Sequence, residues 1–125
     1  MTENPTTLVS HYLAAFNEPD GALRQELVER VFTTDATYLD PLMSAAGPAA
    51  LTTMIGAAQA RFPGHRFVAG DPPDAHHDVV RFGWHLLGPD GDRVATGLDV
   101  AHLAEDGRMR SVVGFLEAPA GRAGA

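Results

Sequence analysis

The chain has 125 residues and a mass of 13.2 kDa, of which 45% are apolar and 20% charged, and this fits a single globular domain. It contains no Cys and no Lys, which excludes disulfides, thiolate nucleophiles, Cys-ligated metals and Schiff-base chemistry. The net charge of −7 argues against a nucleic-acid partner, and no apolar run is long enough to cross a membrane. We therefore expect a cytoplasmic protein with neither partner.

Two segments with helical periodicity come first along the chain, followed by a short strand, a third helical segment and then a series of strands. Apolar residues recur at helical spacing over about 5–17, 21–32 and 48–62, with Asn4-Pro5, Asp20 and Gly47-Pro48 as start signals. A short strand is predicted at 36–40, and strands separated by Gly- and Asp-rich turns are predicted at 66–69, 75–87, 94–103 and 109–116.

This order predicts an α+β cone in which three N-terminal helices pack on a strongly curved, mostly antiparallel sheet that encloses a hydrophobic pocket. We expect one domain over 1–125, with 118–125 as a flexible tail. In the second half, the period of two places Phe82 and Trp84 on one face of their strand, and His85 on the other.

Three polar residues have mainly apolar neighbours in the sequence. Asp40 ends a strand beside Pro41, so it is either a base with a raised proton affinity or the cap of a turn. Asp99 lies in mid-strand, where Gly97 leaves space for a ligand; it either faces a pocket or faces water. Tyr12 shares a helical stripe with Phe16, and its phenol either bonds Asp99 or a ligand, or simply anchors the helix.

The remaining candidates concern the pocket wall and metals. Tyr38 is the alternative to Tyr12 as the hydroxyl group of the site. The expected apolar lining of the pocket is Met54, Phe62, Phe67, Phe82, Trp84 and Phe115. The adjacent His76 and His77 would point to opposite faces of a strand, so we predict no metal site and no cofactor.

The element order and the segments 12–17, 35–41 and 106–108 resemble the nuclear-transport-factor-2-like (NTF2-like) superfamily, which includes ketosteroid isomerases, SnoaL-type polyketide cyclases and limonene epoxide hydrolases. The resemblance to ketosteroid isomerases implies that Asp40 is a general base, while Tyr12 and a protonated Asp99 form an oxyanion hole. Leu39 departs from the isomerase pattern, because the closest isomerases have an acid there.

Two functions from different classes follow. The first is a cofactor-free enzyme of the ketosteroid isomerase or SnoaL type, which moves a proton next to the carbonyl of a hydrophobic compound. The second is a non-catalytic protein that binds a small ligand, as a homodimer through the sheet face that the superfamily commonly uses. Epoxide hydrolysis is a weaker third hypothesis, because that chemistry pairs an Asp with an Arg two residues earlier, where this chain has Gly97.

Overall fold

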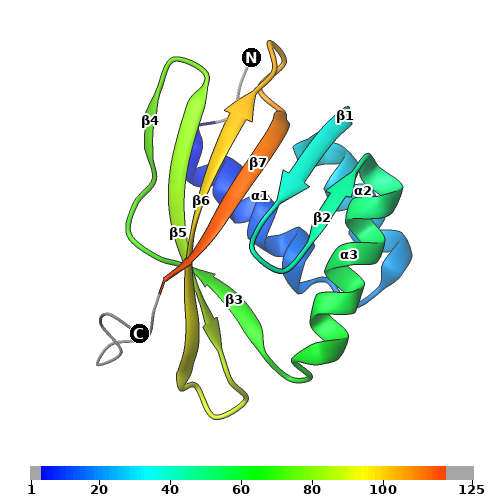
Figure 1. The fold of residues 1–125 in the computed structure, drawn as a ribbon, viewed down its shortest axis with the longest axis vertical. Helices are drawn as coiled ribbons and strands as arrows, with labels where there is room; N and C mark the ends of the chain where they lie inside the picture. The colour runs from blue at the N-terminus through cyan, green and yellow to red at the C-terminus, as the bar shows by residue number, and fades with distance from the viewer. Residues whose placement is uncertain (1–3, 118–125) are drawn as a thin grey trace.

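A computed structural model describes residues 4–117, and the expected tail at 118–125 lies outside the described residues. Residues 4–117 form three helices (Figure 1): α1 spans Pro5–Asn17 and α2 spans Gly21–Val31, while α3 spans Pro48–Arg61 and follows the first two strands. Their start signals act as predicted, since the Asn4 carboxamide accepts from the Thr7 N–H at 2.8 Å and the Asp20 carboxylate accepts from two N–H groups. None of the helices in residues 4–117 is both long and apolar enough to cross a membrane.

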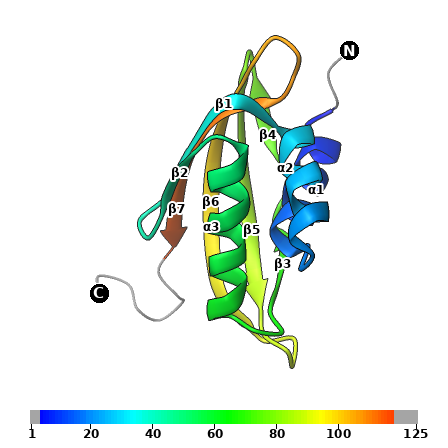
Figure 2. The ribbon, with the colours of Figure 1, turned by 90° about the vertical axis from the view of Figure 1, so that its right-hand side faces the viewer.

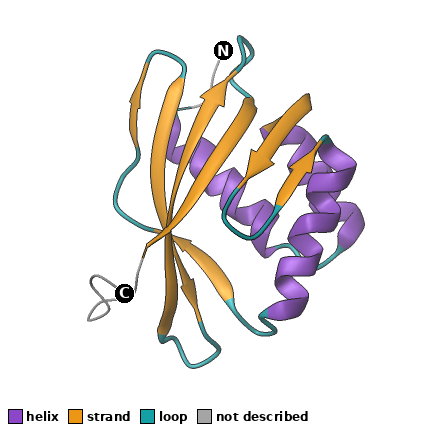
Figure 3. Cartoon of the chain, viewed as in Figure 1, coloured by secondary structure: helices purple, strands orange, loops and turns teal. Residues whose placement is uncertain are grey.

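The seven strands form one mixed sheet in the order β2-β1-β7-β6-β5-β3, with β4 also paired to β5. Their bounds are Phe32–Leu39 (β1), Ser44–Ala46 (β2), Arg66–Ala69 (β3), Asp74–His76 (β4), Val79–Leu87 (β5), Arg93–Leu103 (β6) and Met109–Glu117 (β7). The pair β1–β7 is parallel and the other pairs are antiparallel. Figures 2 and 3 show the helices gathered on one side of this curved, open sheet.

Two strand predictions need correction. The segment 75–87 is not one strand, because His77 adopts a left-handed conformation (φ 53°) and turns the chain between β4 and β5. The same turn brings the Nδ1 atoms of His76 and His77 within 3.1 Å of each other, rather than on opposite faces. The first strand also begins earlier than expected, directly after α2, and folds back on the unpredicted strand β2.

A buried arginine joins the helices to each other. The Arg24 side chain on α2 donates to the backbone carbonyls of Glu18, Pro19 and Thr52 and to the Gln59 carboxamide, at 2.9–3.3 Å. Gly56 on α3 leaves room for it, since a Cβ there would lie 2.7 Å from the Arg24 Nη1 atom. Helix α3 is thereby fixed against the end of α1, where it covers one side of the sheet.

Candidate active site

The alternation of β6 and its neighbours determines which side chains enter the fold. Asp99 pairs with Phe82 on β5 and with Gly114 on β7, so all three lie on the face that the helices cover. Two residues earlier on β6, Gly97 pairs with Trp84 on β5 and with Leu116 on β7, and these residues lie on the same face. The strand pairing therefore points the Asp99 side chain into the apolar interior, where Asp99 is only 2% exposed.

Tyr12 and Asp99 form a buried phenol–carboxyl pair. The Tyr12 hydroxyl donates to Asp99 Oδ2 at 2.7 Å, and the Tyr12 side chain is 1% exposed. Of the partners that sequence reasoning left open for Tyr12, the structure provides Asp99. Burial raises the pKa of Tyr12 well above its usual value, and the neighbouring Asp99 carboxylate raises it further. This phenol therefore acts as a hydrogen-bond donor.

Asp99 has a perturbed acidity. Burial raises the pKa of its carboxyl group from 3.8 to about 6, and the charge of Asp40 acts in the same direction. Hydrogen bonds from Tyr12 and Trp84 stabilise the carboxylate and oppose part of this rise. The alternative that Asp99 faces water is wrong, because Asp99 is buried under the helices and lines a cavity.

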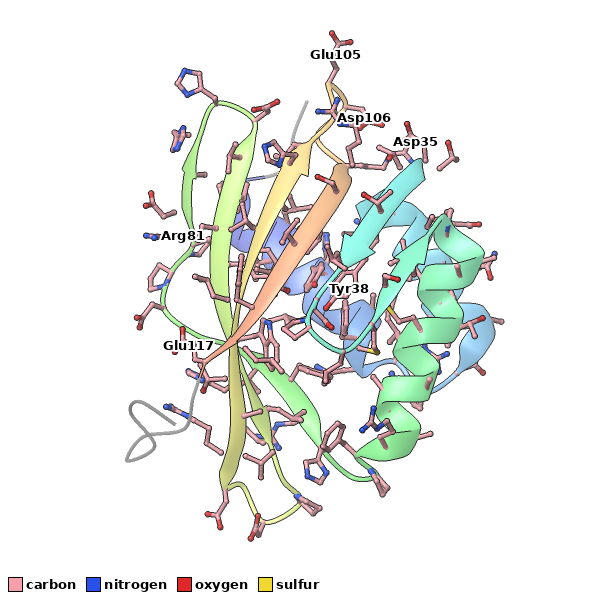
Figure 4. All side chains as sticks on the ribbon, in the orientation of Figure 1. Asp35, Tyr38, Arg81, Glu105, Asp106 and Glu117 are labelled. Carbon is pink, nitrogen blue, oxygen red and sulfur yellow. The ribbon has the colours of Figure 1, made fainter. Side chains whose placement is uncertain are left out.

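Asp40 caps a turn and also lines the cavity, so the two roles proposed for it are compatible. Its Oδ1 accepts from the backbone N–H groups of Leu42 and Met43, both at 2.8 Å, which fixes the turn after β1. Its Oδ2 accepts from the Tyr38 hydroxyl at 2.6 Å. Figure 4 shows Tyr38 in the interior, and burial followed by the charge of Asp99 raises its pKa.

Two glycines make this arrangement possible. A Cβ at Gly114 would lie 2.7 Å from Asp99 Oδ1 and 3.3 Å from the Asp40 Cβ, so the two carboxyl groups approach each other across this residue. A Cβ at Gly97 would lie 2.1 Å from Cζ2 of the Trp84 indole. The space over Gly97, which sequence reasoning reserved for a ligand, is therefore filled by Trp84, whose indole stabilises the Asp99 carboxylate.

The cavity that these groups share has a volume of about 120 Å³. Of the predicted site residues, it is lined by Tyr12, Tyr38, Asp40, Phe62, Phe67, Trp84 and Asp99. Sequence reasoning missed Leu13, Phe16, Leu42, Met43, Ala58, Leu86, Ala95 and Leu116. Phe16 could have been found, because it follows Tyr12 by one helical turn and their rings are 4.7 Å apart.

Three predicted lining residues lie elsewhere. Phe82 is on the correct face but is buried behind Tyr12, with an edge-on ring contact at 4.9 Å. Met54 lies on the buried face of α3 and packs in the hydrophobic core. Phe115 is 55% exposed on the outer face of β7, because the inward residues of that strand are Val112, Gly114 and Leu116. Within residues 4–117, no cluster of three or more His, Asp or Glu side chains could hold a metal ion.

The layered fold and this cavity define the class of protein: an NTF2-like cone, in which helices close one side of a curved sheet. The SnoaL-like domain model matches residues 9–112, and the chain belongs to the SnoaL-like family. A search of curated proteins found no match.

Solved structures agree with this assignment. A proposed isomerase of the SnoaL-like family from Agrobacterium tumefaciens str. C58 is 45% identical, with a TM-score of 0.87 over 90% of this chain and 97% of its own. A proposed SnoaL-like polyketide cyclase from Jannaschia sp. CCS1 is 17% identical, with a TM-score of 0.68 over 94% and 91%. An NTF2-like protein of unknown function from Cytophaga hutchinsonii is 11% identical, with a TM-score of 0.68 over 94% and 93%. The last two show the shared fold alone.

Proposed function

We propose that the protein is a cofactor-free acid–base enzyme that acts next to the carbonyl group of a hydrophobic compound. The observation that carries this proposal is the hydrogen-bonded pair of Tyr12 and Asp99, which lies buried beside Asp40 in one apolar cavity. Such a constellation has a carboxylate to receive a proton and two groups that can donate hydrogen bonds. The similarity to a proposed isomerase supports the same class of reaction.

In this mechanism, Asp40 Oδ2 removes a proton from the carbon next to the carbonyl, and the electron pair of the C–H bond forms an enolate. The enolate oxygen accepts hydrogen bonds from Tyr12 and from protonated Asp99. An isomerase returns the proton from Asp40 to another carbon, whereas a cyclase uses the enolate carbon to attack a second carbonyl. The Tyr12 hydroxyl has to turn from Asp99 toward the ligand, because it donates to Asp99 when no ligand is present.

The test is proton exchange, which does not require the natural substrate. Incubation of a cyclic ketone in D2O should incorporate deuterium next to the carbonyl, and nuclear magnetic resonance measures the rate. We expect Asp40→Asn to abolish exchange and Tyr12→Phe to slow it by about a hundred- to a thousandfold. Turnover of a Δ5-3-ketosteroid, followed by absorbance, then tests whether steroids are substrates. Exchange at the wild-type rate in folded Asp40→Asn would remove Asp40 from the mechanism.

A second candidate function is binding without catalysis. The observation that favours it is that both phenols already donate to carboxyl groups, so the polar atoms of the cavity are satisfied without a reacting ligand. Saturable ligand binding without any deuterium exchange would support this function in place of the enzyme.

We propose in addition that a second copy of the chain covers the outer face of the sheet. Leu39 pairs with Val113 and Val113 with Val100, while Phe115 pairs with Leu98, which makes one continuous apolar patch across β1, β7 and β6. Leu39, Val113 and Phe115 are exposed in the single chain. A patch of this kind is self-complementary across a two-fold axis, which favours a homodimer.

A further inference from the structure

The ionisable groups that line the cavity share one property. Within residues 4–117, those that line it are two phenols and two carboxyl groups, with no Arg or His side chain among them. The chain also has no Lys anywhere. The described ion pairs Arg81–Asp74 and Arg108–Asp106 involve neither cavity acid. A ligand in this cavity therefore meets negative charge and meets no cationic side chain.

Both carboxyl groups accept hydrogen bonds in the same part of the cavity. With its pKa at about 6, Asp99 is ionised at pH 8, where Tyr12 and Trp84 stabilise its charge. Asp40 accepts three hydrogen bonds and donates none, as an ionised carboxylate does. Because the two groups approach each other across Gly114, their potentials add in the same part of the cavity.

The uncharged part of the wall also favours a cation. Six aromatic side chains line the cavity: Tyr12, Phe16, Tyr38, Phe62, Phe67 and Trp84. The faces of aromatic rings attract cations, and tryptophan does so most strongly. The volume of about 120 Å³ is comparable to the ~150 Å³ cavity that holds one benzene molecule, so one six-membered ring fits.

We propose that this cavity selects its ligand by charge: it binds an apolar ring that carries a protonated amine more tightly than the neutral analogue, and it rejects carboxylates and phosphates. The ammonium group lies between Asp40 and Asp99, and the ring lies against the aromatic wall. Burial of an ammonium ion is costly, but pairing with a carboxylate offsets the cost. Asp40 is only half-buried, so the ion keeps part of its hydration there. The inference goes beyond the proposed function, because it concerns the ionised form of Asp99, whereas the enolate of the proposed function needs the protonated form.

The test compares three probes that share one ring: cyclohexylamine, cyclohexanone and cyclohexanecarboxylate. Binding at pH 8 is measured by isothermal titration calorimetry and by the fluorescence of Trp84, which is the only tryptophan in the sequence and lies in the cavity wall. We expect the amine to bind at least about tenfold more tightly than the ketone, from cation–π attraction and the two carboxylates together. No binding of the carboxylate is expected.

Two variants with the same change in net charge separate the cavity from the general charge of the protein. Asp40→Asn keeps an oxygen for the Leu42 and Met43 N–H groups, and it should lower amine affinity by a larger factor than ketone affinity. Glu105→Gln changes an exposed acid in the turn between β6 and β7, far from the cavity (Figure 4), and should leave both affinities unchanged. Circular dichroism verifies that each variant is folded.

Several results would overturn the proposal. Equal wild-type affinity for amine and ketone would do so without any variant, as would tight binding of the carboxylate. An equal loss of amine affinity in Asp40→Asn and Glu105→Gln would show that only the overall charge attracts the amine. The deuterium-exchange assay is independent of this test. Amine selectivity without deuterium exchange supports the charge-selective cavity and contradicts the proposed enzyme activity. Deuterium exchange without amine selectivity supports the enzyme activity and contradicts the charge-selective cavity.

Discussion

Replacement of Asp99 by Asn should change how the stability of the protein depends on pH. The folded protein holds the pKa of Asp99 at about 6, against an ordinary value of 3.8. Folding therefore favours the protonated form, and the wild type loses stability as the pH rises from about 4 to about 6. A difference of about two pKa units corresponds to about 3 kcal/mol in the free energy of unfolding. Asp99→Asn has no such titration, so its stability relative to the wild type should rise by about 2–3 kcal/mol between pH 4 and pH 8.

Urea unfolding of the proteins at pH 3, 4, 6 and 8, followed by circular dichroism, measures this difference. The amide introduced by Asp99→Asn also has a cost that does not depend on pH, such as a poor contact with the Trp84 N–H. This cost cancels when the difference in unfolding free energy between variant and wild type is compared at two pH values. Asp90→Asn is a control of opposite sign, since backbone hydrogen bonds lower the pKa of this exposed acid, and its removal should cost more at pH 8 than at pH 3. A stability difference for Asp99→Asn that does not vary with pH would refute the argument from burial.

Three further predictions follow from the same geometry. If the enolate needs protonated Asp99, kcat/KM for ketone exchange should fall about tenfold per pH unit above pH 6, and a pH–rate profile that rises there would contradict this role. Gly97→Ala should displace the Trp84 indole, destabilise the fold by about 1–3 kcal/mol through overpacking and weaken ligand binding, as measured by thermal melts and titrations. Gly83→Ala is the control and should change neither quantity, because its Cβ would lie 3.5 Å from the nearest atom. Phe115→Glu should convert a dimer into a monomer in light scattering, whereas Leu23→Glu on α2 should leave the mass unchanged; a wild-type monomer would exclude the dimer.

The helices were predictable because their signals are local. Asn4, Asp20 and the Gly47–Pro48 pair act through neighbouring backbone groups, and the apolar stripe of α1 coincides with its buried face. The stripe of α2 is a weaker guide, because Leu23 is exposed and Arg24 is buried. The turn at His77 was not predictable, because a left-handed conformation at a non-glycine residue leaves no clear trace in the sequence. Strand β2 has only three residues, which is too few for a periodic pattern to show.

The candidate site was predictable in its polar residues and less so in its walls. Asp99 and Tyr12 stood out because each is a polar group in an apolar pattern, and the structure brings them within 2.7 Å. The error at Phe115 has a different origin, since adjacent residues of β7 face opposite ways and only its pairing with β6 determines which one enters the cavity. That pairing joins segments distant in sequence, so the pattern within one strand does not contain it.

The contact between the Trp84 indole and the backbone at Gly97 ties two positions of the chain together. Trp84 fits because its cross-strand partner has no side chain, and a larger residue at 97 would need a smaller one at 84. In relatives that keep this cavity, the two positions should therefore vary as a pair. An arginine at position 97 would place a positive charge beside Asp99, so one paired exchange would convert an acidic cavity into one that contains an ion pair.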